Sequence, residues 1–351
     1  MAKEYTYTTI IDKYFCLQSS VLRLGWILVF RYDQLHLESL GIRRRQVPVI
    51  LKSLFKYRLP GQQYPTSIIT LPVFGHLCIK VHHGHKFFDL SNLRATKLFD
   101  SEVSTADTAR EIEAIVDAGS LDFVPTVLEV DPDNRWYSEV FIPGTRSRKT
   151  QASDPGILYK TTIIHQLRKM IMSKPIHTVN LGSYVHNLRG KLGDQLKSTR
   201  LDSELHNNAQ TFITTIAAQL ESSDNFAISL AFTHGDFSFV NFICRDDEIS
   251  VIDWEDSSER SLLHDLFNYF FTEIFYERTQ STLDTDINDA IHLLLEQHDV
   301  SGLIESPITI DNQNVYRWLY YLERMITLLS RDASSNRSRV IQRTIDIFTA
   351  N

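Results

Sequence analysis

Residues 233–255 constrain the fold of this chain more than any other segment. Asp236 is the last residue of a His-Gly-Asp sequence. Asn241 lies five residues after Asp236, and Asp253 lies twelve residues after Asn241. The runs 239–244 and 248–253 are mostly apolar and flank a short polar gap, which predicts a β-hairpin. A loop and a hairpin of this kind supply one carboxylate to orient an attacking hydroxyl. They also supply a carboxamide and a second carboxylate to hold magnesium, and the segment therefore predicts a phosphoryl transfer site.

Size and composition favour a globular protein with more than one domain. The chain has 351 residues, of which 43% are apolar and 23% charged, and this length favours two lobes or domains. No stretch reaches the roughly 18–20 apolar residues of a membrane span, and the first residues lack the pattern of a signal peptide. Three cysteines without metal-ligand spacing argue against a disulfide framework or a zinc site. We therefore expect a protein of the reducing cytoplasm.

Charge is distributed unevenly along the chain. The net charge is −7, yet residues 1–60 carry ten Lys or Arg against four Asp or Glu. Two interpretations of this basic part are open. It is either an amphipathic helix that contacts an anionic membrane surface or an acidic glycan, or a solvated helix face that packs on its own protein. The acidic bulk of the chain argues against nucleic acid as a partner.

Hydrophobic periodicity changes twice along the sequence. Residues 1–60 read as helical and end at Leu59-Pro60-Gly61. Short β-rich runs follow over 67–99 and 123–142, separated by Gly, Asn or Pro, and they predict an antiparallel sheet. Residues 105–118 between these runs have one apolar face and predict a helix.

The rest of the chain is mostly helical in periodicity, apart from a strand at 228–232 and the hairpin described above. We therefore predict an α+β fold in three parts. A basic helical extension spans 1–60, a small antiparallel-β lobe spans 61–143, and a larger, mostly helical lobe spans 144–351 and carries both the His-Gly-Asp loop and the metal-binding strand.

In these motifs the chain resembles the aminoglycoside phosphotransferase and choline kinase family, the small-molecule relatives of protein kinases. The family's catalytic loop, HGDxxxxN, is matched by residues 234–241, and its magnesium strand, Ile-Asp-Phe/Trp, by residues 252–254. The Asp-Leu pair that supports the loop in the family is matched by Asp265-Leu266. The resemblance runs from about residue 67 to the end. It implies a bilobal protein-kinase-like fold and the transfer of phosphate from ATP or GTP to a hydroxyl of a small molecule.

The resemblance also implies roles for individual residues. Asp236 corresponds to the catalytic carboxylate that accepts or orients the proton of the substrate hydroxyl, and Asn241 and Asp253 correspond to the ligands of Mg²⁺. One carboxylate, one amide oxygen and phosphate oxygens suffice for this ion, which usually keeps several waters. Glu255 has two interpretations: it contacts a second metal or a water, or it pairs with a nearby Arg or Lys.

A site of this type also needs a strand lysine for the nucleotide phosphates and a glutamate on the following helix to pair with it. Lys80 and Lys97 compete for the first role. Lys97 is favoured because it lies in an Ala-x-Lys sequence on the last strand before the helix at 105–118. Its predicted partner is Glu111, since Glu113 lies about 200° away around a helix and only one of the two can face the nucleotide.

Residues 137–143 are predicted to form the hinge between the lobes. Backbone groups near Glu139 and Phe141 would hydrogen-bond the purine edge, and an ordinary edge strand is the alternative interpretation. Residues 82–85 occupy the hairpin at which the family places its phosphate loop, although only Gly84 of the glycine pattern is present.

The sequence as a whole predicts a magnesium-dependent small-molecule kinase that uses ATP or GTP. Its acceptor would be a hydroxyl of a sugar, a glycan or an aminoalcohol. A non-catalytic scaffold that binds nucleotide is a second hypothesis, against which the intact Asp236, Asn241 and Asp253 argue. A protein kinase is a third, but Asp265-Leu266 follows Asp253 too soon for an activation segment. The sequence selects neither the acceptor, nor the nucleotide, nor the oligomeric state.

Overall fold

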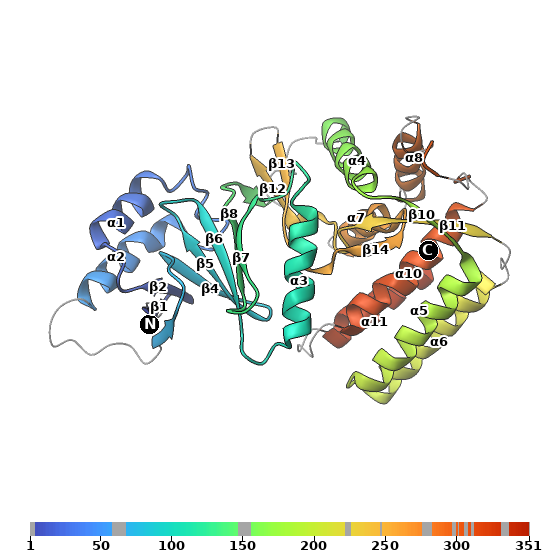
Figure 1. Ribbon diagram of the computed structural model, residues 1–351, viewed down its shortest axis with the longest axis horizontal. Coiled ribbons are helices and arrows are strands. Elements are labelled where there is room, and N and C mark those ends of the chain that lie inside the picture. The colour runs from blue at the N-terminus through green and yellow to red at the C-terminus, as the bar shows by residue number, and fades with distance from the viewer. Residues whose placement is uncertain are drawn as a thin grey trace. The chain divides into compact units, whose positions relative to one another are not determined.

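The computed structural model places the chain in two compact units. Unit 1 comprises residues 1–152 and 240–255, and unit 2 comprises residues 153–239 and 256–351. Figure 1 shows the helices and strands of both units. The structure describes residues 4–57, 68–146, 156–221, 226–245, 248–275, 283–296, 300, 302–304, 308–309, 312–330 and 337–350.

Unit 1 is built on an eight-stranded antiparallel sheet with the spatial order β3-β1-β2-β4-β5-β6-β8-β7. The antiparallel sheet predicted from the β-rich runs at 67–99 and 123–142 is present, and it contains the hairpins β4–β5, β5–β6 and β7–β8. The strands are β1 Tyr5–Ile10, β2 Lys13–Cys16, β3 Ile68–Leu71, β4 Leu77–Val81, β5 Gly84–Asp89, β6 Arg94–Phe99, β7 Val127–Asp131 and β8 Trp136–Val140.

The N-terminal part differs from the predicted helical extension. Helices α1 (Val21–Phe30) and α2 (Val47–Lys56) are present, but β1 and β2 form a hairpin that inserts between β3 and β4. The alternation of Tyr, Thr and Ile along β1 suits a strand better than a helix, because β-branched and aromatic side chains pack well on a pleated surface. Residues 4–57 are therefore an integral part of unit 1 rather than a separate extension.

Helices α1 and α2 cover one face of this sheet (Figure 1). Their buried apolar side chains, such as Leu24, Ile27 and Leu54, share a core with Leu77 and Phe88 of the strands. On the opposite face a smaller cluster forms around Tyr7, Cys16, Cys78 and Phe87. Helix α3 spans Thr105–Ala118, the predicted bounds, and its N-cap is Ser104, whose hydroxyl accepts the amide hydrogen of Asp107.

The hairpin predicted around the polar gap at 245–247 is also present. It consists of β12 (Phe242–Arg245) and β13 (Glu248–Val251), and β12 also pairs with β9 (Thr145–Arg146). Sequence reasoning assigned this hairpin to the C-terminal lobe, whereas it is part of unit 1. The reason is its bonding: β12 joins β9, the amide of Val251 donates to the carbonyl of Phe123, and the Trp254 ring packs near that of Phe123.

Unit 2 is mostly helical, as predicted, with a three-stranded antiparallel sheet in the order β10-β11-β14. Ser258 starts β14 and pairs with Thr233 of β11. No described helix is long and apolar enough to cross a membrane. The elements are α4 Gly156–Met172, β10 His177–Asn180, α5 Leu181–Ser198, α6 Ser203–Glu221, β11 Ala227–Thr233, β14 Ser258–Ser261, α7 His264–Phe275, α8 Leu283–Leu295, α10 Gln313–Ser330 and α11 Arg337–Ala350.

Candidate active site

The loop that carries Asp236 is held by a buried carboxylate at the start of α7. The two oxygens of Asp265 accept the backbone hydrogens of His234 and Gly235 at 2.6 and 2.9 Å. Gly235 has φ +83°, and a Cβ atom there would lie 2.5 Å from the carbonyl oxygen of Asp256, so the position requires glycine. Charge-assisted bonds of this kind are strong and directional. The support that the sequence predicted from Asp265 is present in the structure.

Asp236 also contacts a residue that sequence reasoning missed. Nη1 of Arg324, on α10, donates to Oδ1 of Asp236 at 3.0 Å, and both side chains are largely buried. The amide of Asp236 donates to Nδ1 of His234 at 3.2 Å. Arg324 lies 88 residues after Asp236, and no local pattern around it signals a contact with the loop. The structure thus fixes both the backbone and the carboxylate of Asp236.

Glu323, the residue before Arg324, is the centre of a buried hydrogen-bond network. Its carboxylate accepts from Tyr184 Oη at 2.7 Å, from both the amide and the hydroxyl of Ser261 at 2.8 Å, and pairs with His264 Nδ1 at 2.8 Å. Burial raises the pKa of Glu323, but these bonds outweigh it and lower the pKa below its usual value. The network anchors α10 to α5, β14 and α7, and thereby fixes the segment of α10 that presents Arg324.

In unit 1, Lys97 and Glu111 form the ion pair that the sequence predicted. Nζ of Lys97 lies 2.5 Å from Oε1 of Glu111, and both side chains are buried. Burial raises the pKa of Glu111 to about 7, although Lys97 opposes the shift. Nζ of Lys97 also lies 3.1 Å from Oε2 of Glu255. Of the two interpretations of Glu255, the structure shows the ion pair with a lysine.

A second lysine, which sequence reasoning missed, lies directly beside Lys97. Lys86 on β5 pairs in register with Lys97 on β6, so both side chains are on the same face of the sheet. Its Nζ lies 2.7 Å from Oε1 of Glu139. Burial lowers the pKa of Lys86, but Glu139 and Asp253 overcome this effect and raise it. The competing candidate Lys80 is exposed. The turn between β5 and β6 sets the register that places Lys86 opposite Lys97.

Asn241 and Asp253 lie at the open end of the hairpin β12–β13. The carbonyl oxygen of Asn241 accepts the amide hydrogen of Ile252 at 3.0 Å, which places Asn241 beside the residue that precedes Asp253. Asp253 has an exposed side chain and a left-handed backbone with φ +63°. Left-handed backbone in a residue other than glycine is uncommon and clusters at functional sites. The hairpin thus brings the two predicted magnesium ligands close together in the chain fold.

A pocket of about 350 Å³ in unit 1 gathers several of the predicted residues. Glu139, Phe141 and Asp253 all line it, together with Lys86. The amide of Phe141 donates to the carbonyl of Leu93 at 2.7 Å, so this N–H is already engaged within the sheet. The other lining residues are Lys13, Ser39, Leu40, Gly41, Ile79, Val81, Phe88, Ala95, Pro125, Val140, Ile142, Ile243 and Ile252.

These residues satisfy the chemistry of a magnesium nucleotide. Among the described residues, no three His, Cys, Asp or Glu side chains form a metal cluster. A carboxylate and a carboxamide, from Asp253 and Asn241, remain as oxygen donors. Magnesium fits such a sparse set, because it retains waters and takes phosphate oxygens from the nucleotide.

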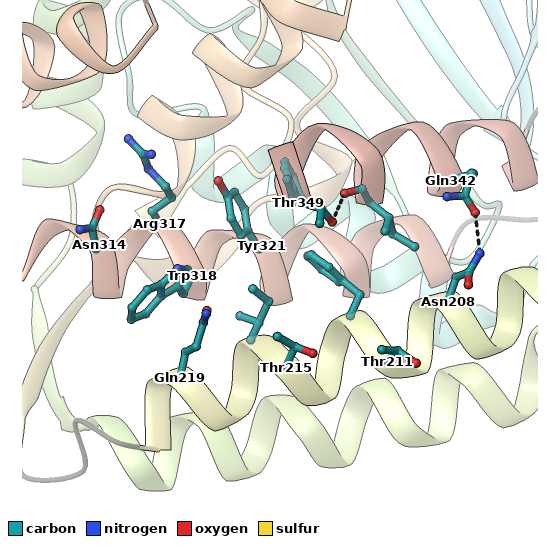
Figure 2. Close-up of a pocket in the computed structure, with 14 residues that line it drawn as sticks. Asn208, Thr211, Thr215, Gln219, Asn314, Arg317, Trp318, Tyr321, Gln342 and Thr349 are labelled. Atoms are coloured by element: carbon teal, nitrogen blue, oxygen red, sulfur yellow. Dashed lines mark hydrogen bonds between the residues drawn. The ribbon is translucent and has the colours of Figure 1, made fainter. Parts of the chain in front are cut away.

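Unit 2 contains a separate groove of about 660 Å³ between α6, α10 and α11 (Figure 2). Amide and hydroxyl side chains surround aromatic rings, and Asn208 and Gln342 are hydrogen-bonded across it at 3.2 Å. None of the residues predicted for catalysis or nucleotide binding lines this groove. It is therefore distinct from the loop that carries Asp236.

Comparison with known proteins supports the resemblance seen in the sequence. The model of the phosphotransferase enzyme family matches residues 165–300, the segment that contains Asp236, Asn241 and Asp253. The match bears out the predicted family resemblance. No curated protein sequence matches the chain.

Three solved structures are among those similar to the chain. Amicoumacin kinase hAmiN in complex with AMP-PNP, Ca²⁺ and Ami is 13% identical with a TM-score of 0.50, over 76% of this chain and 84% of that one. A choline/ethanolamine kinase family protein from Mesorhizobium loti is 16% identical with a TM-score of 0.48, over 86% and 94%. An aminoglycoside phosphotransferase from Streptomyces rimosus in complex with ADP and streptomycin is 15% identical with a TM-score of 0.49, over 71% and 92%. At this level of identity, the likeness to the amicoumacin kinase concerns the fold alone, and it agrees with the predicted α+β class.

Proposed function

We propose that this protein is a magnesium-dependent kinase that transfers the γ-phosphoryl group of ATP or GTP to a hydroxyl of a small molecule. One observation carries the proposal: Lys86, Glu139 and Asp253 line the same pocket. Lys97 lies beside Lys86 on the same face of the sheet. The family match over residues 165–300 supports the same reaction class. A sugar, a glycan or an aminoalcohol is the expected acceptor.

The residues of unit 1 would bind the nucleotide. Lys86 and Lys97 supply two ammonium groups from adjacent strands, and Glu111 keeps Lys97 in place through their ion pair. Asn241 and Asp253 would hold Mg²⁺, which when bound neutralises charge on the phosphates. Fixed charges of this kind account for most of the acceleration in phosphoryl transfer, because they need no reorganisation during the reaction.

Asp236 would orient the acceptor hydroxyl and take its proton. The hydroxyl oxygen forms a bond to the γ-phosphorus while the bond from that phosphorus to the β–γ bridging oxygen breaks, and the nucleoside diphosphate leaves. The proton of the hydroxyl passes to the Asp236 carboxylate. Arg324 and Asp265 hold this carboxylate and its backbone in place, and proton acceptance of this kind contributes roughly 10²–10⁴-fold to rate.

The test is a screen of sugars, aminoalcohols, aminoglycosides and a mixed peptide library for phosphate acceptance from Mg-ATP and Mg-GTP. With an active acceptor in hand, Asp236→Asn should abolish turnover while nucleotide affinity is retained. Asp194→Asn, an exposed aspartate in the same unit, is the matched control and should leave turnover unchanged. Near-normal turnover in Asp236→Asn would remove Asp236 from the catalytic role.

The screen also separates the alternative functions. A chain that binds nucleotide but neither hydrolyses it nor phosphorylates any acceptor would be a scaffold. Phosphorylation of peptides alone would indicate a protein kinase. The structure disfavours that outcome, because only a 3₁₀ turn (Trp254–Asp256) and the strand β14 lie between Asp253 and the start of α7.

We further propose that helix α1 makes peripheral contact with an anionic membrane surface. Leu22, Trp26 and Phe30 are spaced by four residues on one face, and their exposed fractions are 83%, 54% and 74%. Apolar side chains this exposed are unusual in a contiguous helix face and mark interaction sites. Exposed basic residues on and near the helix, such as Arg23 and Lys52, give the charge that suits anionic lipid.

Deletion of residues 1–60 is unsuitable as a test, because it would remove two strands of the sheet. The double variant Trp26→Ser with Phe30→Ser should reduce pelleting with vesicles of phosphatidylserine and phosphatidylcholine at least severalfold. Val116→Ser, an exposed valine on α3, serves as the control and should pellet like the wild type. Equal pelleting of all three proteins would refute membrane contact through α1, and self-association that the double variant abolishes would assign the face to a second copy of the chain.

A further inference from the structure

One wall of the pocket in unit 1 comes from the N-terminal part of the chain. Lys13, at the start of β2, and the turn Ser39-Leu40-Gly41 line the pocket together with Lys86 and Asp253. The family resemblance begins at about residue 67, so this wall lies outside it. The N-terminal hairpin and the segment after α1 therefore add residues to the pocket beyond those that the resemblance implies.

The register of the sheet places Lys13 in line with the two other lysines. Ile79, Lys86, Lys97 and Tyr137 are direct cross-strand partners on β4, β5, β6 and β8, and they form one row on one face. On the neighbouring strand, Tyr14 of β2 pairs with Cys78 of β4. The two strands are antiparallel, so the residue before Tyr14 lies opposite the residue after Cys78, and Lys13 is therefore placed opposite Ile79. We call Lys13, Ile79, Lys86 and Lys97 the lysine row.

The next row on the same face has a different chemical character. It contains Phe15, Leu77, Phe88 and Ala95, and it ends at Glu139. These apolar side chains belong to the core that α1 and α2 cover. On this face the positive charge is thus concentrated in the lysine row, which is the row suited to phosphate. Of the apolar row, Phe88 and Ala95 also line the pocket and are suited to contact a base.

Lys13 differs from its two counterparts in its surroundings. Lys86 is paired with Glu139, and Lys97 with Glu111 and Glu255. No carboxylate within the described ranges pairs with Lys13. Its side chain lies over Gly41, since a Cβ atom there would be 3.1 Å from Cε and 3.3 Å from Nζ of Lys13. Gly41 has φ +78°, so the position favours glycine for its backbone and leaves room for the lysine.

We propose that Lys13 binds the phosphate groups of the nucleotide, and that the turn Ser39–Gly41 holds its ammonium group at the pocket. The inference rests on the proposed function, because it assumes that a nucleotide occupies this pocket. An ammonium group without a carboxylate partner adds net positive charge to the site. Lys13 is thus a binding residue, supplied by the N-terminal hairpin, that increases affinity for the charged part of the nucleotide.

The test measures the affinities of the full chain for AMP-PNP, ADP and adenosine by calorimetry in the presence of Mg²⁺. Lys13→Met should weaken AMP-PNP binding about tenfold, the loss expected for one charge-assisted contact, and should leave adenosine binding unchanged. Lys13→Arg should restore most of the affinity. Lys52→Met, a lysine exposed on α2, is the matched control and should bind all three ligands like the wild type.

The outcomes distinguish this inference from the function on which it rests. Wild-type protein that binds none of the three ligands would overturn the nucleotide site itself, and the role of Lys13 with it. Wild-type binding with no change in Lys13→Met would overturn only the role of Lys13. Equal losses for AMP-PNP and adenosine would show that Lys13 shapes the pocket wall without contacting phosphate, which also contradicts the proposal. Gly41→Ala should give an intermediate loss for AMP-PNP, because it displaces the ammonium group without removing its charge.

Discussion

Replacement of Glu323 tests whether the buried network in unit 2 anchors α10, the helix that presents Arg324 to Asp236. In Glu323→Ala, the donors of Ser261 and Tyr184 lose their acceptor, as does the imidazole of His264. Ser261 and His264 are buried, so water cannot replace the carboxylate. Each buried donor left without a partner costs about 1–3 kcal/mol. With partial relaxation, the expected loss in the free energy of unfolding is about 4 kcal/mol.

Glu323→Gln separates the effect of shape from that of charge. The amide keeps one acceptor oxygen and the side-chain volume, so roughly half of the loss, about 2 kcal/mol, is expected. The assay is urea unfolding followed by far-ultraviolet circular dichroism. Glu204→Ala, an exposed glutamate on α6, is the control and should change stability by no more than about 0.5 kcal/mol. A loss below about 1 kcal/mol in Glu323→Ala would refute the view that this carboxylate anchors α10.

Three further predictions concern unit 1. Burial raises the pKa of Asp89, but the nearby His76 imidazole and hydrogen bonds from Asn92 outweigh it and lower the pKa from 3.8 to about 2. Asp89→Asn should therefore lower the free energy of unfolding by about 2 kcal/mol at pH 7. In urea titrations this difference should disappear as the pH falls from about 4 to about 2, because it depends on the ionised carboxylate. Lys97→Met should lower the free energy of unfolding by about 3–5 kcal/mol at pH 8. The loss should be smaller at pH 6, because Glu111 without its lysine can bind a proton there. A loss of the same size at both pH values would contradict this explanation. Gly84→Ala should lower the melting temperature, since a Cβ there would lie 2.1 Å from the carbonyl of Leu98, whereas Gly190→Ala, with open space around it, should raise it slightly.

Much of unit 1 follows from local sequence patterns. The bounds of α3 were predicted correctly because its apolar periodicity is interrupted at both ends by polar residues and glycine. The pairing of Lys97 with Glu111 was also predicted, because a site of this type needs a strand lysine and a glutamate on the following helix, and Lys97 lies on the last strand before α3. The hairpin β12–β13 was recognisable from its apolar runs, and with it the proximity of Asn241 to Asp253.

Other elements of the same unit were misread because two periodicities compete in short segments. The N-terminal hairpin was expected to be helical, although the Tyr-Thr alternation of β1 fits a strand. Its partner β3 lies about sixty residues later, so nothing local reveals that an open sheet edge is available for it. The assignment of β12–β13 to the C-terminal lobe failed for a similar reason, since its partner β9 lies about one hundred residues earlier.

The sequence by itself determined the order of the chemistry: a carboxylate loop, a carboxamide and a second carboxylate on a hairpin, and a lysine with its glutamate. These features lie in motifs with spacings of fewer than twenty residues, and such local motifs can be recognised by their resemblance to those of a known family. Only the tertiary structure decided that Arg324 holds Asp236, that Glu323 anchors α10 and that Lys13 joins the pocket. These contacts join residues far apart in the chain, and their geometry depends on sheet register and helix packing, which are set by burial of the whole core rather than by any local pattern.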